Sequence, residues 1–288
     1  MCCPVCHARG TATRLAVVTT RQFRVERCTR CGLAYATPRP TPGELRAFYA
    51  DEYFSGGHGG KLGYRDYGGE SWAAANARSM WPLLKEWEPC LAKVVHAHLD
   101  IGCAEGDLGG AALSDGWAVS GVEPADRARQ KAAARGLRTF ATLEDVVGSY
   151  GLITMLHVLE HMIDPLAALR RAREVVAADG VLVVELPQWG SLGRRVRRSQ
   201  WAQLKPPEHI NFFNARSLSY ALRATGWRVA RCVTIQERPF ALAATALRRR
   251  QLTRAVAYAA GGTIVERSGL GGYLRTLAIP DGRSATIR

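Results

Sequence analysis

The feature that most constrains the fold is a regular alternation of strand-like and helix-like segments from about residue 70 onward. The segments between the strands have helical spacing of Ala and Leu against Arg, at Ala125–Ala134 and Pro165–Ala178. Continuous apolar strands that alternate with helices favour a parallel sheet covered on both faces. The sequence therefore predicts an α/β fold with a doubly wound, mostly parallel sheet, whose strands are expected at Ala97–Ile101, Ala118–Glu123, Arg138–Ala141, Leu152–His157, Val181–Leu186 and Arg228–Ile235.

A glycine-containing loop follows the first of these strands, in the run His98-Leu-Asp-Ile-Gly-Cys-Ala-Glu-Gly106. Glycines at a strand-to-helix turn let the backbone approach a ligand and leave its N–H groups free to donate hydrogen bonds. Sheets of this class bind ligands at the carboxyl ends of their strands. The loop is therefore a candidate cofactor site, and on this pattern alone a dinucleotide-dependent enzyme is an alternative.

Four of the eight cysteines form two Cys-x-x-Cys pairs near the N-terminus, Cys3 with Cys6 and Cys28 with Cys31. Two such pairs close a tetrahedral thiolate site, the structural type of zinc coordination. Short strands expected at Thr13–Val18 and Gln22–Arg27 suit a zinc ribbon over residues 1–37. A segment this short buries too little apolar surface to fold without its metal.

Other interpretations of the cysteines remain open at this stage. The same spacing fits a redox-active pair or an iron site. Cys2 and His7 could replace one of the four ligands, although neither fits the paired spacing as well.

The loop sequence Leu-Asp-Ile-Gly-Cys-x-x-Gly resembles motif I of class I S-adenosylmethionine (SAM)-dependent methyltransferases rather than the three-glycine dinucleotide fingerprint. Ala104 departs from the glycine that this family often has there. The resemblance covers about residues 1–236 and implies a Rossmann-like seven-stranded sheet, SAM as cofactor and S-adenosylhomocysteine as product.

The same resemblance implies a set of cofactor-binding residues. Glu123, at the end of the second strand, matches the family's acidic residue that accepts both ribose hydroxyls; a cap for the next helix is the alternative. Thr142–Glu144 matches the adenine contacts. The full expected set is Tyr67, Asp100, Gly102, Cys103, Ala104, Gly106, Glu123, Pro124, Leu143, Glu144 and His157.

Two further blocks point to candidate catalytic residues. The run Ile153–Pro165 resembles the strand-4 segment of a broad group that includes ubiquinone-type O-methyltransferases, which places His157 at the strand mouth; Glu160 and His161 could simply hold that loop together. The run Trp201–Leu218 resembles a block of zinc-ribbon-bearing methyltransferases.

Within that second block, Glu208-His209 matches a Glu-His pair of sugar C-methyltransferases, but Pro206-Pro207 replaces the usual Tyr-His before it. We expect His209 to be the general base, Glu208 to orient it, and His157 to be the second candidate.

The remaining segments complete the predicted organisation. Residues 38–69 are expected to be a proline-rich linker and a Tyr/Gly-rich flap, residues 70–238 the catalytic domain, and residues 239–288 a helical extension with a possible closing strand at Ser284–Ile287. The amphipathic stretch Phe240–Tyr258 is compatible with core packing, a lid, a homodimer contact or a membrane surface.

The net charge of +14 raises the question of the partner. The arginines are spread along the chain with local clusters such as Arg194–Arg198, which could hold a phosphate or carboxylate of the substrate. We expect a small-molecule acceptor, possibly anionic, and no nucleic acid. The leading acceptor is a hydroxyl of a sugar, nucleotide-sugar or natural product; sugar C- or N-methylation and an RNA-binding or RNA-modifying zinc-ribbon protein are the alternatives.

The chain shows neither an apolar run long enough to cross a bilayer nor a secretory signal at its N-terminus. The expected location is the cytoplasm.

Overall fold

The computed structural model describes residues 2–10, 12–14, 23–49, 80–85, 91, 94–236 and 263–282, and the structural statements below concern these residues. Tyr67, the proposed flap, the amphipathic stretch at 240–258 and the strand expected at 284–287 lie outside them. Within the described ranges no helix is both long and apolar enough to cross a membrane.

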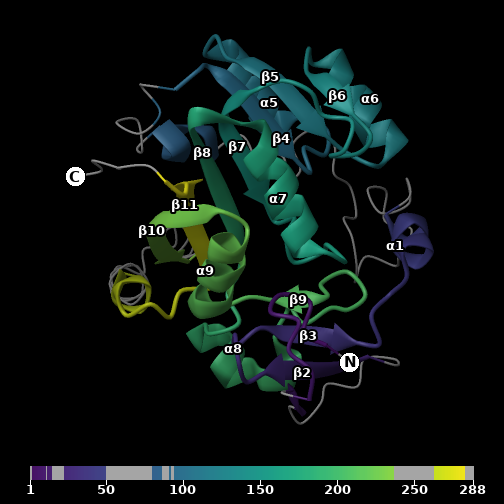
Figure 1. The fold of residues 1–288 in the computed structure, drawn as a ribbon, viewed down its shortest axis with the longest axis vertical. Coiled ribbons are helices and arrows are strands. Elements are labelled where there is room, and N and C mark those ends of the chain that lie inside the picture. Colours follow the sequence, from purple (N-terminus) through teal and green to yellow (C-terminus); the bar gives the residue numbers. More distant parts are fainter. Residues whose placement is uncertain are drawn as a thin grey trace, which may run out of the picture.

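The larger of two sheets has the order β10-β11-β8-β7-β4-β5-β6 (Figure 1). Strands β8, β7, β4, β5 and β6 run parallel to one another, whereas β11 is antiparallel to both of its neighbours. The predicted Rossmann-like fold with a mostly parallel seven-stranded sheet is therefore confirmed. The strands are β4 (Ala97–Ile101), β5 (Ala118–Val122), β6 (Arg138–Phe140), β7 (Tyr150–Leu156), β8 (Val176–Pro187), β10 (Trp227–Ile235) and β11 (Tyr273–Pro280).

Helices cover both faces of this sheet because successive strand residues point to opposite sides. Leu182 of β8 belongs to a core shared with α7 (Pro165–Val175) and α9 (Ala215–Ala224). Its neighbour Val183 belongs to a second core shared with α5 (Asp107–Ser114) and α6 (Asp126–Ala134). The doubly wound arrangement follows from this alternation.

The boundary between α7 and β8 differs from the sequence expectation. The helical pattern extends to Ala178, but α7 ends at Val175 and β8 begins at Val176. Val176 pairs with Tyr150 of β7, so sheet pairing overrides the helical preference of the alanines that follow.

The smaller sheet has the order β1-β2-β3-β9 and is antiparallel throughout. It consists of β1 (Ala12–Arg14), β2 (Arg24–Cys28), β3 (Ala34–Thr37) and β9 (Asn211–Phe212). Because β9 comes from the segment between β8 and α9, the N-terminal sheet is joined to the rest of the molecule. In Figure 1 it lies at the end of the molecule away from α6.

Two further helical segments lie in the connections. The helix α1 (Pro42–Phe48) begins with a capping box of Thr41 and Glu44. The helix α8 (Leu192–Arg197) and the 3₁₀ turn η1 (Arg198–Gln200) follow β8 and carry all four arginines of the predicted cluster Arg194–Arg198.

Candidate functional site

The loop from β4 to α5 has the backbone that a close ligand approach requires. Gly102, Ala104 and Gly106 all have positive φ, at 78°, 48° and 81°. A Cβ at Gly102 would meet the Cγ2 of Val158 at 2.3 Å, so only glycine fits there. The N–H groups of Gly102 and Cys103 donate to the Val122 carbonyl, which ties the loop to the end of β5.

Glu123 follows β5 and is 5% exposed. Its Oε2 accepts the N–H of Ala104 (3.1 Å) and its Oε1 accepts the N–H of Ala125 (2.9 Å). A carboxylate oxygen has two acceptor positions, so each oxygen retains one for a further donor. Burial raises the pKa of Glu123 to about 7. The predicted ribose-binding carboxylate is thus fixed beside the glycine loop, and its bond to Ala125 is with the N-cap residue of α6 rather than with an N–H of the first helical turn.

Asp100 lies on β4, just before the glycine loop, and belongs to a buried chain of polar side chains with Thr154 and His98. The Thr154 hydroxyl donates to Asp100 Oδ1 (2.6 Å) and lies 2.8 Å from His98 Nε2. Burial raises the pKa of Asp100 to about 7 and lowers that of His98 to about 3. His98 is therefore neutral at physiological pH.

The other expected cofactor residues lie around the same edge. Cys103 is buried and Pro124 is exposed at the start of α6. Leu143 is buried and Glu144 is exposed in the turn after β6. Arg171 of α7 fixes that turn by donating to the carbonyl oxygens of Leu143 and Glu144.

His157 lies at the end of β7 with an unusual positive φ of 57°. Its Nδ1 is 3.7 Å from Glu160 Oε1 and its Nε2 is 3.4 Å from Glu185 Oε1. Burial alone would lower the pKa of His157, but the two carboxylates raise it to about 10. The ring packs edge-on against Tyr273. The two carboxylates thus favour the charged imidazolium form of His157.

His209, in contrast to His157, is a neutral imidazole. Its Nδ1 lies 2.9 Å from the Gln203 carbonyl oxygen, and because a carbonyl only accepts, Nδ1 carries the proton. Burial, followed by the charges of His161 and Lys205, lowers the pKa of His209 well below 6.5. The neutral ring therefore keeps a lone pair on Nε2.

The carboxylate of Glu208 has a lysine neighbour, and its predicted role in orienting the His209 ring stays a prediction. Its Oε1 lies 2.5 Å from Lys205 Nζ, while the Gln203 carbonyl holds His209. Each of the two adjacent side chains therefore has a contact of its own, with Lys205 for Glu208 and with Gln203 for His209.

Backbone contacts place His209 close to the glycine loop. The N–H groups of Ile210 and Asn211 both donate to the Glu160 carbonyl oxygen. That carbonyl belongs to the loop after β7, whose Val158 lies against Gly102. The predicted blocks around residues 157 and 209 are therefore brought together at the carboxyl edge of the sheet.

Glu160 and His161 complete this cluster. Glu160 is 2% exposed, and neither carboxylate oxygen has a hydrogen-bond partner among the described residues. His161 Nδ1 lies 2.6 Å from the Tyr49 hydroxyl and 2.7 Å from the Glu208 carbonyl oxygen. One ligand atom from each of Glu160, His161 and His209 lies within 4.8 Å of the others, a set that could hold a metal ion.

Sequence reasoning missed several residues that shape this site. Arg39, expected in a plain linker, donates to the carbonyl oxygens of Met162, Ile163 and Ile210 and to Asn211 Oδ1. Its signal was a lone arginine between two prolines. Glu185 could have been found as the one charge within the apolar run Val181–Leu186.

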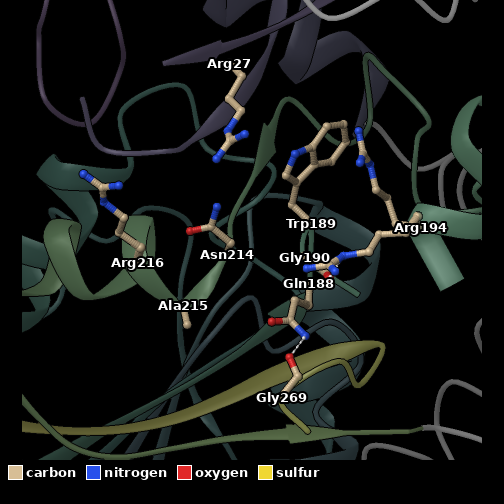
Figure 2. Close-up of a pocket in the computed structure, with 10 residues that line it drawn as sticks. Arg27, Gln188, Trp189, Gly190, Arg194, Asn214, Ala215, Arg216 and Gly269 are labelled. Carbon is tan, nitrogen blue, oxygen red and sulfur yellow. Dashed lines mark hydrogen bonds between the residues drawn. The ribbon is translucent and has the colours of Figure 1, made fainter. Parts of the chain in front are cut away.

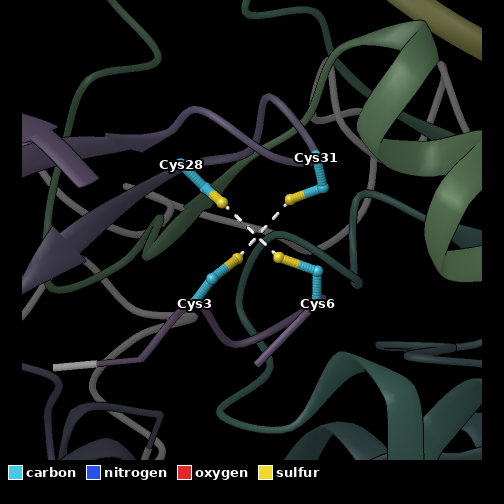
Figure 3. Close-up of side chains that lie close together, drawn as sticks. All are labelled: Cys3, Cys6, Cys28 and Cys31. Carbon is cyan, nitrogen blue, oxygen red and sulfur yellow. Dashed lines mark hydrogen bonds between the residues drawn. The ribbon is translucent and has the colours of Figure 1, made fainter. Parts of the chain in front are cut away.

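The four predicted zinc ligands converge in the N-terminal sheet, as Figure 3 shows. All four cysteines are buried. The Sγ atoms of Cys3 and Cys31 are 3.5 Å apart, and those of Cys6 and Cys28 are 3.4 Å apart. Tetrahedral zinc with bonds of about 2.3 Å needs sulfur separations of about 3.8 Å, so the cluster fits the metal closely. Cys2 is exposed and none of the seven described cysteines forms a disulfide.

Comparison with solved structures supports the same fold. A magnesium protoporphyrin IX methyltransferase from Synechocystis PCC 6803, solved with bound S-adenosylhomocysteine, aligns with a TM-score of 0.54, 14% identity and coverage of 84% of this chain and 100% of that one. The plantazolicin methyltransferase BamL aligns at 0.53, with 16% identity and coverage of 83% and 97%. The [4+2]-cyclase SpnF also aligns at 0.53, with 20% identity and coverage of 85% and 98%. Since a cyclase shares the fold, the fold alone does not fix the reaction.

Sequence comparison is more specific. Ubiquinone biosynthesis O-methyltransferases of Actinobacillus pleuropneumoniae serotype 7 and Haemophilus ducreyi are 34% and 31% identical over 99 residues, 29% of this chain. The matched stretch spans 42% of the length of these relatives. A family model described as "Methyltransferase domain" matches residues 75–231, more than half of the chain. The predicted resemblance is confirmed, and the chain belongs to this methyltransferase family.

Proposed function

We propose that the protein transfers a methyl group from SAM to a hydroxyl of a small molecule, with His209 accepting the hydroxyl proton. The observation that carries the proposal is the neutral ring of His209, whose Nδ1 donates its proton to the Gln203 carbonyl, so that the lone pair is on Nε2. The ring is held beside the loop that lies against Gly102. A neutral, oriented imidazole near a cofactor loop is what proton removal requires.

The residues around Gly102–Gly106 would hold the cofactor. The positive-φ backbone allows close approach, Glu123 would accept the two ribose hydroxyls, and Leu143 with Glu144 would flank the adenine. Bound there, SAM supplies an electrophilic methyl group. The protein then contributes alignment of the acceptor and removal of its proton.

His157 has a positioning role in this account. As an imidazolium it joins Glu160 of the loop to Glu185 of β8, and Arg275 of β11 adds a second cation at 2.6 Å from Glu185. These contacts fix the loop that carries Val158 and the Glu160 carbonyl. Loss of the His157 charge would loosen the loop against which His209 is held.

We assign the cluster of Glu160, His161 and His209 to proton handling rather than to a metal ion. A divalent cation on Glu160 would lie beside the charged ring of His157, whose Nδ1 is only 3.7 Å from the carboxylate. The repulsion between two cations at that separation opposes metal binding. The buried cluster of four cysteines is the zinc site of this proposal, with a structural role only.

Incubation of the protein with methyl-labelled SAM and a panel of small hydroxyl-bearing acceptors tests the function. We expect label in the small-molecule fraction as an alkali-stable methyl ether, with turnover unaffected by a chelator of divalent ions that leaves the buried zinc in place. Label on carbon or nitrogen would replace O-methylation by one of the alternative reactions. Label recovered only in RNA would contradict a small-molecule acceptor.

A further inference from the structure

A pocket of about 420 Å³ lies between the N-terminal sheet and the segment that follows β8. Figure 2 shows its lining, to which four parts of the chain contribute. Arg27 comes from β2, five residues between Gln188 and Arg195 follow β8, Asn214 to Arg216 lie at the start of α9, and Gly269 precedes β11. None of these residues belongs to the cofactor loop or to the His157–His209 cluster.

The lining of this pocket is strongly and uniformly basic. Four of the ten lining residues are arginines, Arg27, Arg194, Arg195 and Arg216, and none is acidic. The amides of Gln188 and Asn214 add further polar groups. Arginine presents a planar fork of donors that matches phosphate and carboxylate oxygens, so this lining is suited to an anion.

Arg194 is repelled by the neighbouring arginines that line the pocket. Its guanidinium lies 3.9 Å above the ring of Trp189, which holds it in place, and its Nε is buried with no hydrogen-bond partner among the described residues. Burial, together with the charges of Arg27 and Arg195, lowers its pKa. A bound anion would relieve this repulsion and supply the missing acceptor.

Hydrogen bonds to backbone carbonyl oxygens hold the pocket in a fixed shape. The Gln188 side chain donates to the carbonyl oxygens of Gly269 and Gly271, and the backbone N–H of Trp189 donates to the carbonyl oxygen of Phe213. Arg216 donates to the Arg30 carbonyl oxygen of the N-terminal sheet (2.9 Å). The arginines are therefore presented by three braced elements rather than by a loose surface.

We propose that this pocket binds the phosphate or diphosphate group of the methyl acceptor. The proposal rests on the proposed function for the identity of the ligand as acceptor. Its volume lies in the range of small-molecule sites, about 300–1,000 Å³. The segment that begins at Gln188 also carries Gln203 and His209, so one continuous stretch of chain would connect the phosphate anchor with the proposed base.

The test is calorimetric titration of the full-length protein, without SAM, with inorganic pyrophosphate and with uridine diphosphate. We expect both to bind, and Arg194→Gln to weaken binding by on the order of ten- to a hundredfold through loss of charge-assisted hydrogen bonds. Arg197→Gln is the matched control, because Arg197 lies exposed on the same helix and does not line the pocket. It should leave both affinities nearly unchanged.

A second pair of variants is needed because the Arg194 variant also loses its contact with Trp189 and could therefore misfold. Arg216→Gln, exposed at the start of α9, should weaken binding, whereas Arg223→Gln, near the end of α9 and outside the pocket, should not. Tighter binding of uridine diphosphate than of pyrophosphate would support a nucleotide-linked acceptor, and equal binding would support a simple phosphate ester.

Any one of three outcomes would overturn the proposal. The first is that neither probe binds the wild-type protein, and the second is that the control variants lose as much affinity as the pocket variants. The third is that a single-stranded RNA oligomer binds more tightly than uridine diphosphate and that all four substitutions weaken RNA binding equally. Because no turnover is measured, failure of methyl transfer alone would leave these affinities intact and would reject only the proposed function.

Discussion

His209→Ala is expected to lower kcat by roughly 10²–10⁴-fold while the affinity for S-adenosylhomocysteine stays near that of the wild type. Nδ1 of His209 is bound to the Gln203 carbonyl, so in the proposed function Nε2 would accept the proton of the acceptor hydroxyl. His209→Asn should be equally inactive, because its amide can still donate to that carbonyl but provides no basic nitrogen. Steady-state kinetics with the identified acceptor measure both variants.

The rival base is His157, and the two can be separated. We expect His157→Gln to retain more activity than either His209 variant. In the proposed function the imidazolium of His157, between Glu160 and Glu185, positions the loop and removes no proton. Glu208→Gln should have a smaller effect still, because the Glu208 carboxylate pairs with Lys205. Near-normal turnover in His209→Ala beside an inactive His157→Gln would move the base to the end of β7.

Purified protein is expected to contain one zinc per chain, and Cys28→Ser is expected to lose it and to destabilise the fold strongly. Structural zinc in small thiolate sites contributes apparent binding free energies of about 10–16 kcal/mol, far more than a single side-chain contact. Loss of the site would release β3, which pairs with β9 beside the loop of His209. Elemental analysis and thermal unfolding provide the two readouts.

Cys2→Ser is the matched control for this substitution, because Cys2 is exposed and lies outside the cluster. It should keep both the zinc content and the unfolding temperature. Iron in place of zinc, or a folded wild-type protein without metal, would contradict the assignment.

The parts of the fold that follow from local pattern were predictable. Apolar strands, helical spacing and paired cysteines each depend on residues close together in the sequence, and β4 was predicted with the bounds that the structure gives, Ala97–Ile101. The turn of the glycine loop likewise depends on residues next to one strand, whereas the ribose-binding role of Glu123 was inferred from the family resemblance and stays a prediction.

What could not be predicted depends on distant partners. The antiparallel strand Tyr273–Pro280 carries Arg275, whose charge is compensated within the sheet by Glu185. Glu185 lies 90 residues earlier in the chain, so no local pattern connects the two. The charge on His157 likewise depends on Glu185, which no local pattern connects to it. The pairing of β3 with β9 joins a predicted ribbon to residues 211–212.

The protonation of Glu123 gives the most direct test of the cofactor site. Its pKa is raised to about 7 in the cofactor-free protein, and only the ionised form accepts both ribose hydroxyls without giving up an acceptor position. Affinity for S-adenosylhomocysteine should therefore be complete above the pKa and fall as the pH drops through it. Asp100, with a pKa also near 7, would contribute any pH dependence that remains without Glu123.

The decisive measurement is calorimetric titration of S-adenosylhomocysteine into wild-type protein and Glu123→Gln, below and above pH 7. The account predicts that Glu123→Gln weakens binding above pH 7 by about 1.5–3 kcal/mol, through loss of charge-assisted hydrogen bonds, and reduces the pH dependence. Equal affinity of the two proteins across this pH range would contradict a cofactor held by Glu123 at the glycine loop.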